Sequence, residues 1–159
     1  MVSAHDFTLP GIRGGEIRLK DFAGQAVLLV NTASACGFTP QYRDLEALWR
    51  ARKGKGLVVL GVPSNDFGAQ EPGTNEDVRA FCEKNYAVTF PLAAKQAVTG
   101  AGAHPLYRWI AAELGEGAAP RWNFHKYLIG PGGAPAGAWP SKVGPLSPEI
   151  ATAIDEALA

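Results

Sequence analysis

The amino-acid sequence predicts an α/β fold in which a central mixed β-sheet is flanked by helices, with a β-hairpin at the N-terminus. Two apolar runs, residues 26–30 and 57–62, enclose a segment with helical periodicity. This order forms a βαβ unit with parallel strands and a right-handed crossover. Two further strand-like runs and a last amphipathic segment make a ββα unit. A chain of 159 residues suits one domain with a substantial core, so we expect residues 1–159 to form a single domain.

The first elements are a hairpin and a buried strand. Residues 6–9 alternate in polarity, and the glycines between positions 11 and 15 provide a turn before a second strand that holds Ile17 and Leu19. The run at 26–30 is short, apolar and rich in Val and Leu, which is typical of a parallel strand covered on both faces. We therefore expect this strand at the centre of the sheet.

A helix is expected after this strand. Thr39 and Pro40 match an N-cap followed by proline at the first helical position, and an apolar stripe continues after them. The densest basic cluster, residues 50–55, closes this helix, where cations complement the helix dipole. We interpret the cluster as a solvated helix end and not as a nucleic-acid-binding patch. The apolar stripe consists of Tyr42, Leu45, Leu48 and Trp49.

The next helix carries the second cysteine. Residues 63–73 form a polar loop, broken by Gly and Pro, at the carboxyl end of the second parallel strand, where α/β proteins place ligands. Thr74 then opens an acid-rich helix start. On the helix pattern alone, Cys82 is a packed core cysteine. Residues 88–92 predict a short edge strand, since they include a proline. The apolar side of the helix comprises Val78, Phe81, Cys82 and Tyr86.

The second half of the chain supplies two helices and a hairpin. One helix runs from His104 towards a Gly/Ala linker at 115–120. Residues 122–129 alternate like a half-buried strand, and the turn at 130–133 joins them to a strand through Ala136 and Trp139. A serine followed by proline at 147–148 caps the last helix.

Cys36 lies in the small-residue loop between the first parallel strand and the first helix. Backbone N–H groups and the positive end of the helix dipole favour a thiolate at such a position, and the thiolate is the reactive form of cysteine. The alternative is a small buried core residue, the commoner role of a free cysteine. The loop context favours the reactive role.

Composition excludes several classes of protein. Fifteen basic and fifteen acidic residues give a formal net charge of zero, and no run of 18 apolar residues predicts a membrane span. The first residues lack the basic and apolar regions of a secretory signal, so we expect a cytoplasmic protein, whose two cysteines serve redox chemistry or packing. His5, His104 and His125 form no metal-binding or Cys-His pattern, and no haem or nucleotide motif is present. We therefore expect no cofactor.

Three segments closely resemble, in order, the motifs of the glutathione peroxidase family. They are residues 31–39 (NTASACGFT), 63–73 (PSNDFGAQEPG) and 122–127 (WNFHKY). The resemblance extends from Phe7 to the final helix. The βαβ and ββα order, with a cysteine at the first junction of strand and helix, is also the thioredoxin-like plan. The resemblance thus implies a thioredoxin-like fold and the reduction of hydrogen peroxide and organic hydroperoxides.

The resemblance implies that Cys36 is the peroxidatic nucleophile and that Gln70, Trp122 and Asn123 surround it. Attack of a thiolate on a peroxide needs donors that stabilise the thiolate and the developing oxyanion, and a proton for the leaving group. The two amides and the indole N–H are donors that carry no charge of their own. These residue types therefore suit the implied chemistry.

The resemblance also bears on Cys82 and on assembly. Some members place a resolving cysteine in a segment similar to residues 81–91, which implies that role for Cys82. A disulfide with Cys36 then requires the helix of Cys82 to unwind partly, because the two residues lie on different elements. Ser64 stands where many relatives carry a further cysteine, and the chain resembles members without the loop used for tetramer assembly. We therefore expect a monomer reduced by thioredoxin and less readily by glutathione.

Three functions are consistent with these residues. They are a thioredoxin-dependent hydroperoxide reductase, a peroxide sensor that relays a disulfide to a partner protein, and an inert binding module with a thioredoxin-like fold. The complete set of four site residues disfavours the third. The first two share the oxidation of Cys36, and turnover with thioredoxin versus trapping of a mixed disulfide separates them. The sequence favours the reductase.

Overall fold

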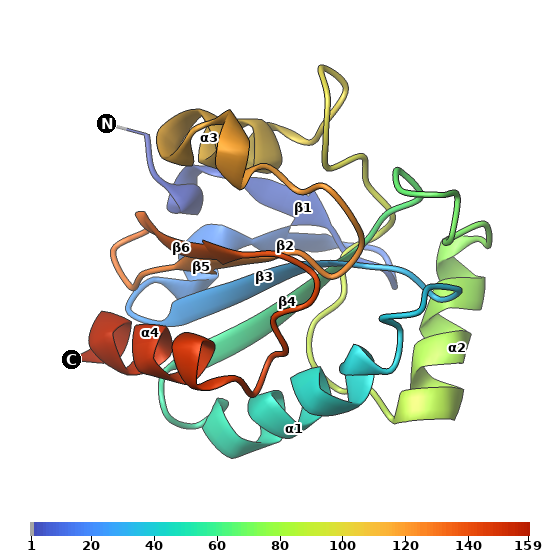
Figure 1. The fold of residues 1–159 in the computed structure, drawn as a ribbon, viewed down its shortest axis with the longest axis horizontal. Coiled ribbons are helices and arrows are strands. Elements are labelled where there is room, and N and C mark those ends of the chain that lie inside the picture. The colour runs from blue at the N-terminus through green and yellow to red at the C-terminus, as the bar shows by residue number, and fades with distance from the viewer. Residues whose placement is uncertain (1) are drawn as a thin grey trace.

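The computed structural model describes residues 2–159, which form two β-sheets, four α-helices and three short 3-10 helices (Figure 1). In chain order, the strands are β1 (Thr8–Pro10), β2 (Glu16–Arg18), β3 (Ala26–Thr32), β4 (Leu57–Pro63), β5 (Lys126–Ile129) and β6 (Pro135–Trp139). The α-helices are α1 (Gln41–Arg52), α2 (Asn75–Tyr86), α3 (Pro105–Leu114) and α4 (Pro148–Leu158). The 3-10 helices are η1 (Ala4–Asp6), η2 (Leu19–Phe22) and η3 (Glu116–Ala118).

The main sheet is mixed, as predicted. Its strand order is β4-β3-β5-β6, with β3 parallel to β4 and antiparallel to β5, and β6 antiparallel to β5. Strands β1 and β2 form a separate antiparallel pair, which confirms the predicted N-terminal hairpin. The βαβ and ββα units therefore meet where β3 pairs with β5. Every residue of β3 is buried, because it is a central strand covered on both faces.

Two apolar layers cover the two faces of the main sheet. One face packs against the hairpin and α3, through residues such as Leu9, Leu29 and Ile110. The other face packs against α1, α2 and α4, through residues such as Leu28 and Leu45. In Figure 1, α3 and the hairpin lie on one side of the sheet and α1 and α4 on the other. None of the helices in the described residues is long and apolar enough to cross a membrane.

The predicted helix starts are confirmed at three of four helices. The Thr74 hydroxyl accepts a hydrogen bond from the Asp77 N–H and caps α2, while the Asp77 carboxylate accepts from the Thr74 N–H. His104 caps α3 through its ring nitrogen, and Ser147 caps α4 through its hydroxyl. Each cap satisfies an N–H group that the helix itself leaves without a partner.

Two predicted strands differ in the structure. Residues 88–92 form no strand; Leu92 makes an isolated parallel bridge to Gly61, so the segment only touches the edge of β4. Of residues 122–129, only Lys126–Ile129 are strand, and all four are buried instead of half-buried. This strand lies between β3 and β6 with helices on both faces, so alternation of polarity is not required there. Residues 122–125 form a turn that precedes it.

Candidate active site

Cys36 occupies a tight turn between β3 and α1. The Cys36 N–H donates to the Thr39 hydroxyl (2.9 Å), and that hydroxyl donates to the Ala33 carbonyl oxygen (2.8 Å). The Phe38 N–H points at the sulfur, with 3.3 Å between Phe38 N and Cys36 Sγ. Cys36 is 9% exposed. The turn therefore presents a nearly buried sulfur to a backbone donor.

The predicted N-cap at Thr39 is wrong. Helix α1 begins at Gln41 behind Pro40, and no side chain caps it. The Thr39 hydroxyl is already used within the Cys36 turn, where it bridges the Cys36 N–H and the Ala33 carbonyl. One irregular turn thus separates Cys36 from the regular part of the helix.

The loop after β4 brings Gln70 to the Cys36 turn. Gly68 and Ala69 both have left-handed backbones, with φ of 68° and 50°. This sharp reversal lets the Gln70 carbonyl oxygen accept from the Ala35 N–H (3.0 Å), next to Cys36. A side chain at Gly68 would come within 2.9 Å of the Trp122 ring, so only glycine fits there.

Asn123 and Trp122 enter from the turn before β5. Asn123 is fully buried, and its side-chain amide donates to Gln70 Oε1 (3.0 Å) and more weakly to the Phe67 carbonyl oxygen (3.4 Å). The Asn31 side chain donates to the Trp122 carbonyl oxygen (3.0 Å) and fixes this turn to the end of β3. The Trp122 ring lies against the Phe67 ring and is 37% exposed.

The side chains of Gln70 and Asn123 are hydrogen-bonded to each other, and neither they nor Trp122 form a hydrogen bond to the Cys36 sulfur within the described residues. Gln70 is linked to Asn123 through its side chain and to the Cys36 turn through its backbone. Within the described residues, the hydrogen bond to Cys36 Sγ comes from the Phe38 N–H and from no side chain of Gln70, Trp122 or Asn123. Because its Oε1 accepts from Asn123, the Gln70 amide group is oriented and its N–H groups are available.

Cys82 is fully buried on α2, as its place in the apolar stripe predicted, and both cysteines are free thiols. Burial raises the pKa of Cys82 to about 11; the neighbouring Tyr42 side chain acts in the opposite direction, and the charges of Glu71 and Glu83 raise the pKa further. The Tyr42 hydroxyl is also fully buried, and burial raises its pKa. Cys82 is therefore a protonated thiol at neutral pH while α2 is intact.

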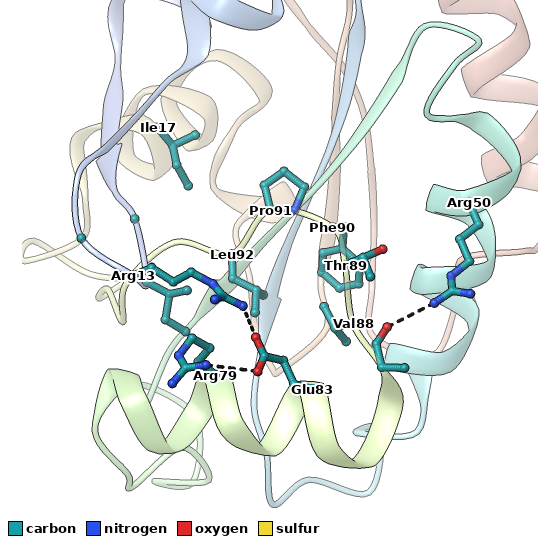
Figure 2. A pocket seen from close by; sticks show the side chains of 14 residues that line it. Arg13, Ile17, Arg50, Arg79, Glu83, Val88, Thr89, Phe90, Pro91 and Leu92 are labelled. Carbon is teal, nitrogen blue, oxygen red and sulfur yellow. Dashed lines mark hydrogen bonds and ion pairs between the residues drawn. The ribbon is translucent and has the colours of Figure 1, made fainter.

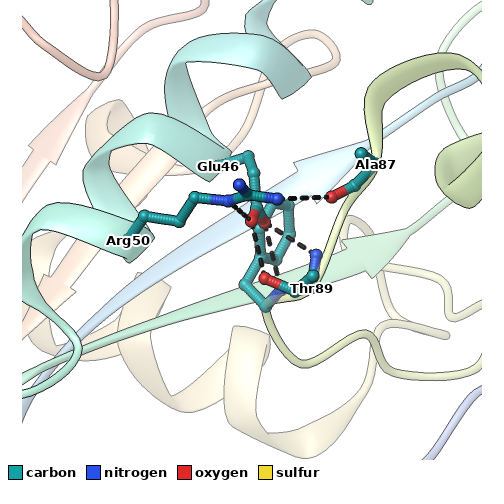
Figure 3. A network of polar contacts seen from close by, with 5 residues as sticks. Glu46, Arg50, Ala87 and Thr89 are labelled. Atoms are coloured by element: carbon teal, nitrogen blue, oxygen red, sulfur yellow. Dashed lines mark hydrogen bonds and ion pairs between the residues drawn. The ribbon is translucent and has the colours of Figure 1, made fainter.

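Glu46 on α1 holds the segment that follows α2 (Figure 3). Its carboxylate accepts from the Thr89 N–H (2.7 Å), the Thr89 hydroxyl (2.6 Å) and the Phe90 N–H (3.3 Å), and it pairs with Arg50 (2.5 Å). Burial raises the pKa of Glu46, but the hydrogen bonds from Arg50 and Thr89 outweigh it and hold the pKa below its ordinary value. Arg50 also donates to the Ala87 carbonyl oxygen. The chain is thus anchored directly behind α2.

A groove of about 670 Å³ lies beside the site. Trp122 and Phe38 form part of its wall, so the groove adjoins both the indole and the residue that donates to Cys36. Arg121 and Lys142 also line it, and neither forms an ion pair within residues 2–159. The remaining apolar lining includes Leu114, Ala118, Ala119, Ala138, Trp139 and Pro140. The groove therefore suits an elongated apolar molecule with an anionic end.

A cavity of about 730 Å³ lies elsewhere, between the hairpin and the C-terminal half of α2 (Figure 2). It contains none of the predicted site residues. Arg13 and Arg79 both point at Glu83 and pair with it, and Arg50 pairs with Glu46. Because its cations are already paired, this cavity offers little free charge to a ligand, although the Arg13 contact does tie α2 to the hairpin.

Sequence reasoning missed a polar cluster beneath Asn123. Lys126 is fully buried and its Nζ donates to the Ser141 carbonyl oxygen (3.0 Å). That carbonyl also accepts from Gln41 Nε2 (2.7 Å), and the Ser141 hydroxyl donates to the Asn123 carbonyl oxygen. The one available signal was a lysine inside a strand with apolar neighbours. Ser141, 18 positions after Asn123, carries no sequence signal for this contact.

The sequence is similar to known proteins over most of its length. Residues 4–111 match the family model for glutathione peroxidase. A hydroperoxy fatty acid reductase of Synechocystis sp. is 44% identical over 133 residues, covering 79% of each chain. A glutathione peroxidase-like peroxiredoxin of Schizosaccharomyces pombe is 46% identical over 118 residues, covering 73% of this chain and 75% of the relative.

Solved structures support the same fold. The apo crystal structure of the protein named Trgpx superposes with a TM-score of 0.79 and 39% identity, covering 99% of this chain and 95% of the other. A thiol:disulfide interchange protein from Chlorobium tepidum superposes with a TM-score of 0.66 at 23% identity over 99% of this chain and 96% of the other, a likeness of fold alone. The predicted thioredoxin-like fold is confirmed.

Proposed function

This chain belongs to the glutathione peroxidase family and is a peroxidase of that family, and from that premise we propose that it reduces hydroperoxides through Cys36 and Cys82. The observation that carries the proposal is the Cys36 turn, where a nearly buried sulfur accepts the Phe38 N–H beside the linked amides of Gln70 and Asn123. The donors in and around this turn, the Phe38 N–H and the two amides, carry no charge.

In the first step, the Cys36 thiolate attacks one peroxide oxygen. A sulfur–oxygen bond forms, the oxygen–oxygen bond breaks, and the leaving alkoxide or hydroxide takes a proton to become an alcohol or water. Cys36 becomes a sulfenic acid. The Gln70 and Trp122 N–H groups act as donors to the oxygen that develops negative charge, and Asn123 fixes the orientation of Gln70.

In the second step, the Cys82 thiolate attacks the Cys36 sulfenic sulfur. A disulfide forms, and hydroxide leaves and is protonated to water. Cys82 cannot do this from within α2, since it is buried there and its pKa of about 11 keeps it protonated. The segment around Cys82 therefore has to open, which both moves the sulfur and exposes it to water.

The groove beside Trp122 supports organic hydroperoxides as substrates. Its apolar wall suits an acyl or aryl chain, and Arg121 and Lys142 suit the carboxylate of such a molecule. The relative from Synechocystis sp. is named a hydroperoxy fatty acid reductase, which accords with this assignment. Hydrogen peroxide needs no such groove and reaches Cys36 as a small solute.

We assign thioredoxin as the reductant of the disulfide, with glutathione as the weaker one. A glutathione-dependent cycle needs no resolving cysteine, because two glutathione molecules can reduce the sulfenic acid in turn. Cys82 supplies an internal disulfide, and the S. pombe relative is named a peroxiredoxin. We further propose that residues 1–159 form one domain that acts as a monomer in the cytoplasm, where thioredoxin is reduced.

The test is peroxide-dependent NADPH consumption coupled through thioredoxin and its reductase, beside a glutathione-coupled assay. We expect faster turnover with thioredoxin, none with Cys36→Ser, and a single oxidation without turnover for Cys82→Ser. Mass mapping after one equivalent of peroxide should then find a Cys36–Cys82 disulfide in the parent and Cys36 sulfenic acid in Cys82→Ser. Normal cycling of Cys82→Ser with thioredoxin would remove the resolving role, and an active Cys36→Ser would remove the whole assignment.

A further inference from the structure

The turn that carries Trp122 and Asn123 has a backbone conformation that its residues disfavour. We call residues 122–124 the donor turn. Its last residue, Phe124, is fully buried and has a left-handed backbone with φ of 64°. This conformation costs free energy in a residue with a side chain, so it persists only where surrounding contacts impose it. The contacts that impose it therefore also decide where the Trp122 and Asn123 side chains point.

Each residue of the donor turn has one backbone group held by another part of the chain. The Asn31 side chain, near the end of β3, donates to the Trp122 carbonyl oxygen (3.0 Å). The Ser141 hydroxyl donates to the Asn123 carbonyl oxygen. The Phe124 N–H donates to the Asn31 carbonyl oxygen (2.6 Å). Two residues, Asn31 and Ser141, thus fix the donor turn against β3 and against the segment that follows β6.

Ser141 is itself held by two other elements. It is buried, and its carbonyl oxygen accepts from Gln41 Nε2 (2.7 Å) at the start of α1 and from Lys126 Nζ (3.0 Å) at the start of β5. Its backbone is therefore fixed before its hydroxyl reaches Asn123. A hydroxyl on a backbone held in this way is a preorganised donor to the turn.

Hydrogen bonds also connect the donor turn to the reactive cysteine. The Asn123 side-chain amide donates to Gln70 Oε1 (3.0 Å). The Gln70 carbonyl oxygen in turn accepts from the N–H of Ala35 (3.0 Å), the residue before Cys36. A shift of the donor turn therefore displaces the Trp122 indole and the amide that orients Gln70.

We propose that Asn31 and Ser141 are positioning residues of the peroxidase reaction: they hold the donor turn in its left-handed form and so aim its donors at the oxygen that develops negative charge. This inference rests on the proposed function, in which Cys36 attacks a hydroperoxide. Donors stabilise a transition state best when they are already in place, and a small misplacement lowers the rate strongly. The Cys36 sulfur accepts from the Phe38 N–H (3.3 Å), outside this turn, so the role concerns the leaving oxygen and not the thiolate.

The test compares two reactions of Cys36 in a Cys82→Ser background, where Cys36 is the remaining thiol. Oxidation by hydrogen peroxide develops charge on the leaving oxygen, whereas in alkylation by iodoacetamide a sulfur–carbon bond forms and iodide leaves. Rapid quenching and mass spectrometry give both rates. We expect Ser141→Ala to slow oxidation by roughly tenfold, less than the roughly 10²-fold effect of losing a donor outright, and to leave alkylation within about twofold. Hydrogen peroxide does not need the groove that Ser141 also lines, so a change in the groove does not affect this comparison.

Two control variants and one double background define the role of the hydroxyl. Ser147→Ala removes a hydroxyl from the same segment that caps α4, and it should change neither rate by more than about twofold. Ser141→Thr keeps the hydroxyl and should restore most of the oxidation rate. In a Trp122→Ala/Asn123→Ala background, Ser141→Ala should slow oxidation by less than about threefold, because the side chains that it positions are already absent.

Several outcomes would overturn the proposal. One is equal slowing of oxidation and alkylation by Ser141→Ala, or no slowing of either; another is the same roughly tenfold effect in the double background. If Ser141→Ala fails to fold, Asn31→Leu makes the same comparison, since it keeps a side chain of similar size and removes the donor to Trp122. A parent whose Cys36 is alkylated but not oxidised by hydrogen peroxide would contradict the proposed function together with this proposal, whereas the other outcomes contradict this proposal alone.

Discussion

Opening of α2 should set the rate at which Cys82 forms a disulfide with Cys36, so a change at either end of this helix should alter that rate. At the N-terminal end, Thr74→Ala removes a capping box in which two N–H groups are satisfied. Loss of an N-cap hydroxyl costs about 1 kcal/mol. If α2 opens and closes rapidly before the disulfide forms, the resolving rate is proportional to the fraction of molecules in which α2 is open. A loss of about 1 kcal/mol raises that fraction, and therefore the rate, by about fivefold, because 1.4 kcal/mol corresponds to a factor of ten.

A substitution at the C-terminal end of α2 should have the opposite effect and slow the formation of the disulfide. Ala87 ends the helix in a left-handed conformation, with φ of 50° and ψ of 42°. That conformation costs a residue with a side chain about 1–2 kcal/mol, and glycine does not have this cost. Glycine loses more backbone entropy on folding, which offsets part of the stabilisation. Ala87→Gly should therefore stabilise the closed helix by about 0.5–1 kcal/mol and slow resolution about two- to fivefold.

The assay is rapid quenching after one equivalent of hydrogen peroxide, followed by mass spectrometry of the Cys36–Cys82 disulfide over time. Ser147→Ala is the matched control, since it removes an N-cap hydroxyl of the same kind from α4, which carries neither cysteine. It should lower global stability much as Thr74→Ala does and leave the resolving rate unchanged. Equal resolving rates in Thr74→Ala and Ser147→Ala, or faster resolution in Ala87→Gly, would refute the opening of α2.

Two further predictions concern the donors and the anchor behind α2. Replacing Gln70 or Trp122 by alanine should slow stopped-flow oxidation of Cys36 by roughly 10²-fold, the scale of losing one preorganised donor; a rate within about twofold of the parent would make that residue structural. Glu46→Gln should lower the urea-derived free energy of unfolding at pH 7 by about 1–3 kcal/mol, against less than about 0.5 for exposed Glu113→Gln. Since the pKa of folded Glu46 is below its ordinary value, this difference should be complete above about pH 4.3 and should diminish as the pH falls through the lower folded value. A difference that does not diminish on acidification would contradict this reasoning.

The strands and the helix caps were predictable because each rests on local chemistry. Apolar runs specified β3 and β4, and a hydroxyl followed three positions later by an acid specified the start of α2 at Thr74. Thr39 shows the limit of such reasoning. Its hydroxyl could cap a helix or close the turn at Cys36, and both uses fit the sequence equally well. The choice depends on how β3 delivers the chain to α1, which is a tertiary property.

The arrangement of the site was less predictable, because it depends on backbone conformations that the residue types disfavour. Within residues 2–159, three residues with side chains have left-handed backbones: Ala69, Ala87 and Phe124. Ala69 precedes Gln70, Phe124 follows Asn123, and Ala87 ends the helix of Cys82. Such conformations persist only where surrounding contacts impose them. At Phe124 the contact is long-range, since its N–H donates to the Asn31 carbonyl oxygen, so no local pattern announces it. At Ala87 the contacts are those of a helix end, where the Ala87 N–H donates back to Glu83.

The burial of Cys82 has a chemical consequence as well as a structural one. With a pKa of about 11, only about one molecule in 10⁴ has a Cys82 thiolate at pH 7 while α2 is closed. In open chain, with an ordinary cysteine pKa of about 8.5, that fraction rises about 300-fold. In the proposed cycle, one structural event, the opening of α2, would therefore both release the Cys82 sulfur from the core and make it a nucleophile. A closed α2 keeps Cys82 buried and protonated. In the proposed cycle, a residue in the apolar stripe of a capped helix would therefore serve first as core and then, once the helix opens, as the resolving thiol.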